Sequence, residues 1–148
     1  MSSRKLITDN IVATLQGITI LAGYSFDMGE VRRKRYQFAD WGGNEKWPKT
    51  CIYSSSETSI PRIGWNIYDH NWSVGIRLFY KGDDADEAID GFLYDVRDSM
   101  LRCSSLTRGN LAWNTCYTGT TEPEDTFEED RHHCSTVLNF LIWYREIY

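Results

Sequence analysis

The chain has 148 residues and a formal net charge of −5 at pH 7, so we expect one domain and disfavour a general nucleic-acid or anionic-membrane binder. Aromatic residues make up 14% of it, and such side chains gather both in cores and in interfaces. No apolar run reaches the roughly 18 residues of a membrane span, and polar residues close behind the N-terminal cations argue against a secretory signal peptide. The sequence thus predicts a single domain over residues 1–148, with no membrane span and no secretion.

The first expected element is a helix over residues 3–22, because apolar residues recur there at steps of three and four. The apolar positions are Ile7, Ile11, Leu15, Ile18 and Ala22. Gly17 and the β-branched residues behind it weaken the last turn, and Gly23 is a natural end. Residues 28–38 alternate like a strand, although neither face is purely apolar. A loop with a Gly-Gly-Asn turn is expected over residues 40–49.

Strands and a hairpin are predicted in the middle of the chain. A short strand follows Pro48 over residues 50–55, and a second one covers residues 64–68. Residues 69–71, Asp-His-Asn, carry a polar turn signal. We therefore expect the chain to reverse there and to form a hairpin with the strand that follows.

A strand followed directly by a helix gives the clearest pattern in the sequence. From Trp72 to Tyr80 apolar residues alternate with a period of two, which predicts a strand with one buried face. After a Lys-Gly pair the period changes to three and four, which predicts an amphipathic helix through about Arg102. Asp84 stands at the expected N-cap, and Glu87 three residues later would complete a capping box.

The C-terminal part predicts two more strands. Residues 111–121 form the weaker one, and residues 134–148 form a strong one with apolar side chains on both faces. Such a strand suits a central place in the sheet, or an outer face that another subunit covers. The order helix, three or four strands, helix, two strands predicts an α+β two-layer sandwich. It has a mainly antiparallel β-sheet and two amphipathic helices on one face.

Patterns for metal binding and catalysis are weak. His132, His133 and Cys134 follow an acidic run, but neighbouring strand residues point to opposite faces and cannot easily share an ion. The acidic residues around Asp84 fail the spacing of an EF-hand loop and suit a helix N-terminus better. Nucleophile-elbow, dinucleotide-binding and P-loop motifs are absent from the sequence. We therefore expect no catalytic, cofactor-binding or metal-binding residues.

The cysteines support the same expectation, because no two of them are spaced as C-x-x-C, the spacing of zinc and redox motifs. They are Cys51, Cys103, Cys116 and Cys134. We expect buried, reduced thiols in a reducing compartment, with a disulfide or a shared metal as the alternative.

Two charged segments are the candidate subunit interface. A basic run lies on the strand-like segment, and an acidic run follows the weaker C-terminal strand. The basic run suits a solvated edge strand or ion pairs with a neighbouring copy; contact with DNA phosphates is the alternative. The candidate residues are Arg32, Arg33, Lys34 and Arg35 on the basic side, and Glu122, Glu124, Asp125, Glu128, Glu129 and Asp130 on the acidic side.

Three segments resemble the tail-terminator, or tail-completion, proteins of long-tailed bacteriophages, a group of small head–tail joining proteins. They are the helix Leu6–Leu15, the proline-led strand Trp47–Tyr53 with polar residues Ser54–Glu57 behind it, and the stretch Val74–Tyr80 followed by Asp83–Val96. Together with the last strand they span nearly the whole chain. The tryptophan-rich loops and the acidic segment have no counterpart in that pattern.

The resemblance implies a sheet flanked by helices and a structural virion protein rather than an enzyme. It implies a homohexameric ring in the virion neck, assembled in the host cytoplasm, at the head-proximal end of the tail tube. There the ring would end tube polymerisation and bind the tail tube protein and the head connector or adaptor protein. DNA would pass through its lumen without sequence-specific contacts.

Two kinds of alternative stay open. One is another protein of the phage tail: a head-completion protein, a connector adaptor or a tail-tube protein. The other, from a different class, is a small cytosolic enzyme or a ligand-binding α+β domain. A ring needs one patch on each subunit and its complement on the other side, and the basic and acidic runs are candidates for that pair.

Overall fold

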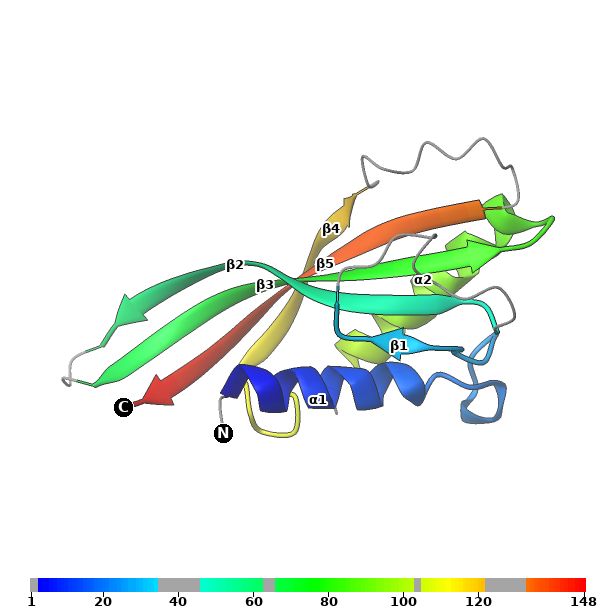
Figure 1. Ribbon diagram of the computed structural model, residues 1–148. Helices are drawn as coiled ribbons and strands as arrows, with labels where there is room; N and C mark the ends of the chain where they lie inside the picture. Colours follow the sequence, from blue (N-terminus) through cyan, green and yellow to red (C-terminus); the bar gives the residue numbers. More distant parts are fainter. Residues whose placement is uncertain (1–2, 35–45, 63–65, 103–104, 122–132) are drawn as a thin grey trace.

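The computed structural model describes residues 3–34, 46–62, 66–102, 105–121 and 133–148, which form two α-helices beside one five-stranded sheet (Figure 1). The elements are α1 (Ser3–Gln16), the 3-10 helix η1 (Ile20–Ala22), β1 (Val31–Arg32), β2 (Lys49–Pro61), β3 (Ile67–Lys81), α2 (Ala85–Leu101), β4 (Asn114–Thr121) and β5 (His133–Ile147). The strand order is β1-β2-β3-β5-β4, with β1 parallel to β2 and all other neighbours antiparallel. The predicted α+β sandwich is confirmed.

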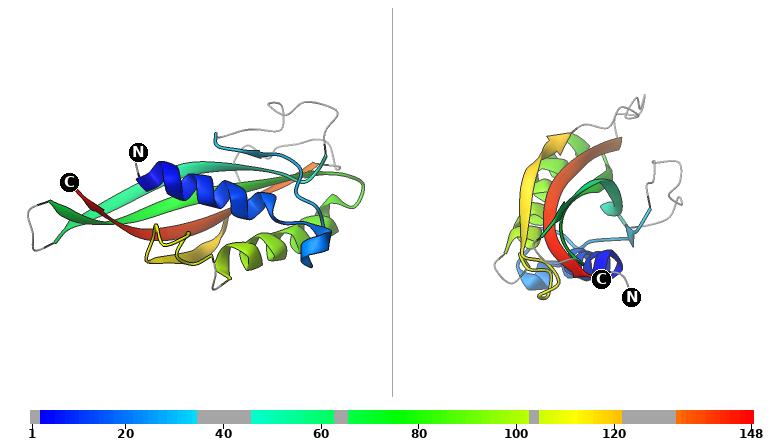
Figure 2. Two further views of the ribbon diagram at one scale, coloured as in Figure 1. Left: turned by 90° about the horizontal axis from the view of Figure 1, so that it is seen from below. Right: turned by 90° about the vertical axis from the view of Figure 1, so that its left-hand side faces the viewer.

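Both helices lie on one side of the strongly twisted sheet, and their apolar faces share one core with it (Figure 2). Every second residue of β3 and β5 points into this core, as a strand with one buried face requires. The fully buried core residues of the described part are Ile7, Ile11, Leu15, Ile18, Val74, Ile76, Leu78, Val96, Met100, Leu138, Phe140 and Ile142. The period-two pattern that starts at Trp72 therefore marks the core face correctly.

The N-terminal helix is shorter than predicted. α1 ends at Gln16, the Gly17 N–H donates to the Ala13 carbonyl at 3.0 Å, and η1 follows as a separate turn. Glycine and β-branched residues have low helix propensity, which explains the break. Gly23 does end the segment, with a φ of 97° that glycine adopts without steric cost. The prediction of one helix through Ala22 is wrong after Gln16.

β2 and β3 form one long hairpin whose turn lies elsewhere than predicted. Residues 69–71 lie inside β3 and pair with residues 58–60 of β2. The two strands meet at Arg62, whose N–H donates to the Ile67 carbonyl at 2.9 Å. Polar residues are typical of turns, but these side chains find cross-strand partners instead. The predicted turn is therefore wrong, and the two short strands predicted around it are parts of longer ones.

A β-bulge in β2 decides which of its side chains face the helices. The pairing moves from Ser54–Val74 to Ser56–Ser73, so Ser55 is the extra residue. A one-residue shift sends all later side chains of a strand to the opposite face. Glu57 therefore lies opposite Trp72, on the helix side of the sheet.

The step from β3 to α2 occurs where the sequence predicts it, but the helix cap differs. Asp84 occupies the N-cap position without a capping hydrogen bond from its side chain. Its carboxylate instead accepts a hydrogen bond from the Tyr80 hydroxyl at 2.9 Å. The predicted capping box with Glu87 is wrong, because the Asp84 backbone (φ −102°, ψ 26°) lacks the extended conformation of a capping residue.

β5 lies between β3 and β4, which confirms its predicted central place in the sheet. Its outward Val137 is 4% exposed and joins other buried groups on the sheet face away from the helices. Cys51 and Phe79 pack there with Trp47 and Tyr53. A methyl group on Gly75 would lie 2.6 Å from the Tyr53 ring, so glycine allows this ring to cross β3.

In the described residues, the strand predicted over residues 28–38 is the short edge strand β1. Val31 and Arg32 pair with Thr50 and Cys51. Residues 35–38 lie outside the described residues, as does the predicted turn at residues 42–44.

Three strands extend beyond the helices and form a projecting arm (Figure 1). We define the arm as residues 56–61 of β2, 67–71 of β3 and 143–147 of β5, which pair with one another. The remainder of the sheet, with α1 and α2, is the helix-covered half. Each face of the arm carries a separate group of polar and aromatic side chains.

Candidate functional site

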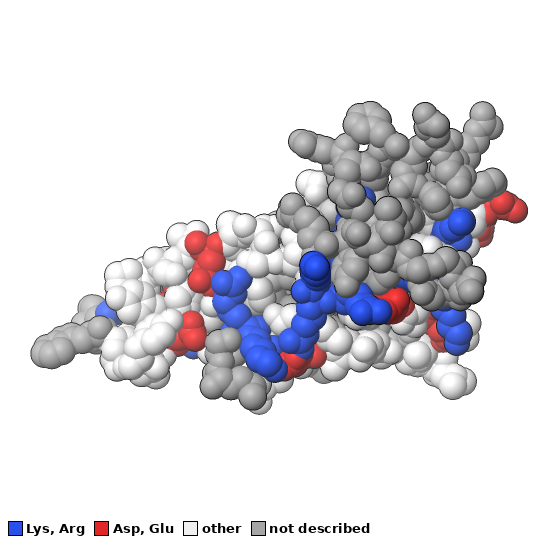
Figure 3. All heavy atoms as spheres, viewed as in Figure 1, with Lys and Arg blue, Asp and Glu red and all other residues white. Residues whose placement is uncertain are grey.

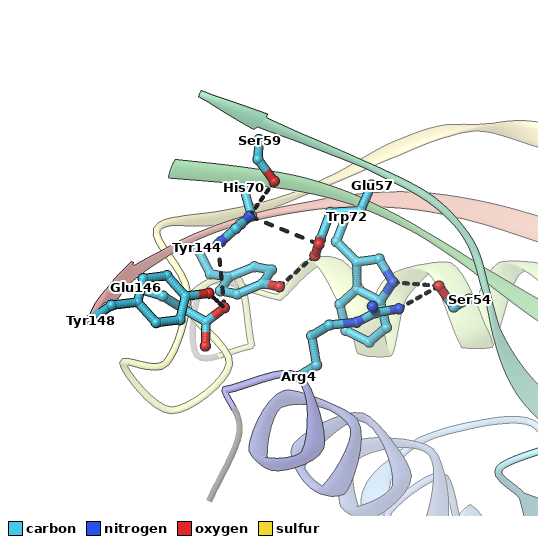
Figure 4. A network of polar contacts seen from close by, with 9 residues as sticks. All are labelled: Arg4, Ser54, Glu57, Ser59, His70, Trp72, Tyr144, Glu146 and Tyr148. Atoms are coloured by element: carbon cyan, nitrogen blue, oxygen red, sulfur yellow. Dashed lines mark hydrogen bonds and ion pairs between the residues drawn. The ribbon is translucent and has the colours of Figure 1, made fainter. Parts of the chain in front are cut away.

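His70 is the centre of a polar network on the helix-side face of the arm (Figure 4). Its side chain is only 7% exposed. The Ser59 hydroxyl lies 2.7 Å from Nδ1, on the strand directly opposite. Glu57 Oε2 lies 3.8 Å from the same nitrogen, and Glu146 Oε1 lies 3.2 Å from Nε2. Nε2 is buried and not aligned for a hydrogen bond to the described residues. The imidazole therefore sits between two carboxylates.

Two tyrosines hold these carboxylates from the other side. The hydroxyl of the buried Tyr144 donates a hydrogen bond to the Glu57 carboxylate. The hydroxyl of Tyr148 donates one to the Glu146 carboxylate at 2.9 Å. Burial raises the pKa of Tyr144, and the hydrogen bond to Glu57 raises it further. The hydrogen bond to Glu146 raises the pKa of Tyr148. The His70 ring also packs on Tyr144, with ring centroids 4.8 Å apart.

The line Ser59–His70–Glu146 has the order of a hydroxyl nucleophile, a base and an orienting carboxylate. Ester or amide cleavage also requires donors that stabilise a developing oxyanion. The charged groups gathered around His70 are carboxylates, which repel such an oxyanion. The arrangement therefore supports acyl transfer poorly.

The opposite face of the arm carries an ion cluster. Arg145 Nε donates to Asp69 Oδ1 at 2.7 Å, and Arg62 donates to the other carboxylate oxygen. The hydrogen bond from Arg145 is the largest cause that lowers the pKa of Asp69 to about 2. The Arg145 guanidinium also lies 4.3 Å from the centre of the Trp113 ring.

Exposed apolar side chains surround this ion cluster. Ile60, Trp113, Trp143 and Ile147 have exposed fractions between 41% and 70%. They border a shallow hollow of about 200 Å³ or lie on the same face of the strands beside it. We call these four residues with Asp69 and Arg145 the outer arm patch. Tryptophan and arginine are the side chains that most often dominate binding at protein interfaces.

The predicted basic interface residues make contacts within their own subunit. Arg32 forms an ion pair with Glu30, and Arg33 forms one with Asp9 of α1. Lys34 is exposed. Arg35 lies outside the described residues, as do Glu122, Glu124, Asp125, Glu128, Glu129 and Asp130. The structure therefore assigns no contact between the two predicted sides.

A basic groove between α1 and β2 went unnoticed in the sequence. It has a volume of about 300 Å³ and is lined by Arg4, Lys5, Thr8, Arg33, Ile52, Tyr53, Ser54 and Trp72. On the face seen in Figure 3, Lys and Arg side chains gather near α1 and β1. The available signal was a pair of cations in the first turn of a helix that has no acidic residue there.

The His70 network was missed for a different reason. His70 and Ser59 meet only because β2 and β3 pair in one register, and the sequence was interpreted as turning at His70. Register follows from the bulge and the turn, which local patterns did not locate.

The described residues contain no group of three or more His, Cys, Asp or Glu side chains that could hold a metal ion. His132 and the acidic residues before it lie outside them. No helix of the described part is long and apolar enough to cross a membrane. Neither a scan against protein-family models nor a search of curated proteins returned a match to this chain.

Proposed function

We propose that this protein is a structural subunit of a tailed bacteriophage that assembles into a ring at the head-proximal end of the tail tube. The ring ends tube polymerisation and joins the tail to the head connector. The resemblance described above suggests this place, and the projecting arm is the observation that carries the proposal. A sheet that extends past its own helices leaves side chains to be covered by another chain.

The outer arm patch suits that use. Its apolar residues surround a paired Arg–Asp cluster, which resembles the core of a protein interface more than an ordinary surface. Ring closure requires a heterologous contact, in which a patch on one subunit meets a different patch on the next. A rigid arm that is continuous with the central sheet can carry such a patch to a neighbour without the cost of ordering a loop.

The proposed partners follow from that place in the particle. They are further copies of this chain, with a hexamer expected, the tail tube protein below the ring and the head connector or adaptor protein above it. DNA passes through the lumen without sequence-specific contacts. The proposed role is not catalytic.

The proposal is tested by mass in solution together with tail length in particles that lack the protein. We expect a ring by native mass spectrometry, overlong tails without the protein, and normal tails when it is added back. Trp143→Ser should reduce ring formation by at least about tenfold. Leu21→Ser is the matched control, since Leu21 is fully exposed outside the arm. A protein that stays monomeric and leaves tail length unchanged would contradict the proposal.

A second candidate function, hydrolysis, rests on one observation, the order of the groups Ser59, His70 and Glu146, although the carboxylates around His70 oppose it. A hydrolase of this type should cleave an activated ester such as p-nitrophenyl acetate, and Ser59→Ala should abolish the activity. Ser56→Ala changes a serine on the opposite face of the same strand and is the control. Equal rates for the wild type and the two variants would exclude this function.

A further inference from the structure

The basic groove between α1 and β2 presents hydrogen-bond donors to an incoming group. Arg4, Lys5 and Arg33 bring three cations to it, and Asp9 supplies the carboxylate that contacts two of them. Lys5 Nζ lies 3.2 Å from Asp9 Oδ2, and Arg33 pairs with the other oxygen. The described residues that line the groove include these three cations and no carboxylate, so its lining is basic. Its chemistry therefore selects an anion.

Contacts with Trp72 and Ser54 position the Arg4 side chain to bind such a ligand. Its guanidinium lies 4.5 Å from the centre of the Trp72 ring, and Nη2 donates to the Ser54 hydroxyl at 2.5 Å. No carboxylate of the described residues forms an ion pair with it. A guanidinium has five N–H donors in a fixed plane, so stacking on the indole leaves most of them available at one edge.

Ser54 adds a donor for the same ligand. Its oxygen accepts from Trp72 Nε1 at 2.9 Å and from Arg4 at the same time. A serine hydroxyl has two acceptor sites and one hydrogen, so both acceptor sites are occupied. The hydroxyl hydrogen is then left to donate to an acceptor in the groove.

The start of α1 adds to the positive potential. Acidic residues usually occupy the first turn of a helix because they complement its dipole, yet this turn holds Arg4 and Lys5 and no acidic residue. The helix therefore keeps the positive end of its dipole uncompensated next to the groove.

We propose that this groove binds the acidic segment, residues 122–130, of a second copy of the chain. The inference rests on the proposed function, since a ring supplies the second copy. The segment contains Glu122, Glu124, Asp125, Glu128, Glu129 and Asp130, and no lysine or arginine. Its carboxylates are opposite in charge to the cations of the groove.

The topology supports a contact between copies. The segment connects β4 to β5, and β4 is the edge strand opposite β1, whereas the groove lies beside β2 near the β1 edge. Complementary charges at opposite edges of one sheet are the arrangement that head-to-tail association requires. The same two edges would face one another between adjacent subunits of a ring.

The length of the segment argues against docking in its own subunit. Thr121 lies three strands from β2, at the level of Cys51, and is about 17 Å from Ser54 by strand geometry. His133 pairs with Lys81 and is about 25 Å from Ser54. The twelve peptide steps between Thr121 and His133 span at most about 43 Å, hardly more than these two distances together. A path to the groove and back would need a fully extended chain running straight through the sheet.

Nucleic acid is the competing occupant, since phosphates also match cations and hydroxyl donors. The net charge of −5 opposes it, because a polyanion must approach a negatively charged molecule. Within a ring, the acidic segment of each neighbour is held at high local concentration, an advantage that free nucleic acid lacks. We therefore assign the groove to the peptide carboxylates.

The test uses a fluorescent peptide of residues 121–131 titrated into the full-length protein at low salt. We expect saturable binding, weakened at least about tenfold by Arg4→Glu with Arg33→Glu. Lys46→Glu with Lys81→Glu is the control of equal charge change at exposed lysines outside the groove. A peptide with all six acidic residues changed to amides should not bind. Single-stranded DNA of equal charge should bind less tightly than the acidic peptide.

A charge exchange tests the same contact between copies. Arg4→Glu with Arg33→Glu should weaken self-association, and adding Glu128→Lys with Glu129→Lys to the same chain should restore it. Failure of the peptide to bind the wild type, tighter binding of DNA than of peptide, or equal loss in the lysine control would each overturn the proposal. Rings that form normally while the peptide does not bind would overturn the groove and leave the proposed function standing. Peptide binding by a protein that forms no ring would support the groove and contradict the proposed function.

Discussion

The helix-covered half and the projecting arm share the strands β2, β3 and β5 but are stabilised by different interactions. In the covered half, β3 and β5 place fully buried aliphatic side chains against α1 and α2. In the arm, the same strand positions carry His70, Tyr144 and Glu146, whose polar groups contact one another. Burial of apolar area stabilises the first region, and mutual satisfaction of polar groups holds the second. The arm is therefore suited to contacts, and the covered half to stability.

The largest expected effect is the loss of stability when a cavity is created in the helix-covered half. Leu138 is fully buried, so Leu138→Ala should reduce the free energy of unfolding by about 2 to 5 kcal/mol. Urea denaturation followed by tryptophan fluorescence measures the loss. Leu21→Ala makes the same chemical change at a fully exposed leucine and should cost under about 0.5 kcal/mol. Equal losses in the two variants would mean that the helices contribute little to the core.

The covered half is also the part that the sequence predicts best. The alternation from Trp72 to Tyr80 and the helical spacing behind it place the core face correctly, because burial of one face imposes a simple period. The fold class follows from the order of these elements. The details fail where a side chain makes a contact other than the expected one, as when the Asp84 carboxylate accepts from the Tyr80 hydroxyl.

The arm escaped prediction because its organisation depends on register. A polar Asp-His-Asn run is typical of a turn, and only the pairing with β2 and β5 shows what these side chains contact. The bulge at Ser55 then moves Glu57 to the face of Trp72. No short-range pattern encodes that shift. The basic groove likewise joins Arg4, Ser54 and Arg33, which are far apart in the sequence.

A second, smaller effect is expected inside the arm itself. Tyr144→Phe removes the donor to the Glu57 carboxylate and should cost about 1 kcal/mol, because the hydrogen bond made by a buried hydroxyl is lost. Tyr148→Phe is the control, since Tyr148 makes the corresponding bond to Glu146 at an exposed position. A smaller loss for Tyr144 than for Tyr148 would contradict the view that buried polar contacts hold the arm.

The same variant changes the response to alkali. The pKa of Tyr144 is raised in the folded protein, so the unfolded chain loses this proton first, above a pH of about 10. The stability that this tyrosine contributes is complete below that pH and declines as the pH rises further. Thermal denaturation between pH 8 and 11.5, in roughly half-unit steps, should show a shallower decline for Tyr144→Phe than for the wild type.

The opposite face of the arm should respond to acid. The pKa of Asp69 is lowered to about 2, chiefly by the hydrogen bond from Arg145. Its contribution to stability is complete above the unfolded value of about 3.9 and is lost as the pH falls through about 2. Asp69→Asn should therefore flatten the decrease in melting temperature below about pH 4. Asp90→Asn makes an equal charge change at an exposed position of α2. It should leave the decrease in melting temperature as in the wild type.

The smallest expected effect on the isolated subunit is at the tip of the outer arm patch. Ile147 is 70% exposed, so Ile147→Ser removes little buried area and should change the free energy of unfolding by under about 0.5 kcal/mol. The same change should weaken self-association, because the lost apolar contact then lies between subunits. Denaturation of the dilute monomer measures the free energy of unfolding. Mass in solution at higher concentration measures self-association. A loss of more than about 1 kcal/mol in the monomer would mean that the patch is packed within the subunit, and the arm would then be a structural extension of the core rather than a contact surface.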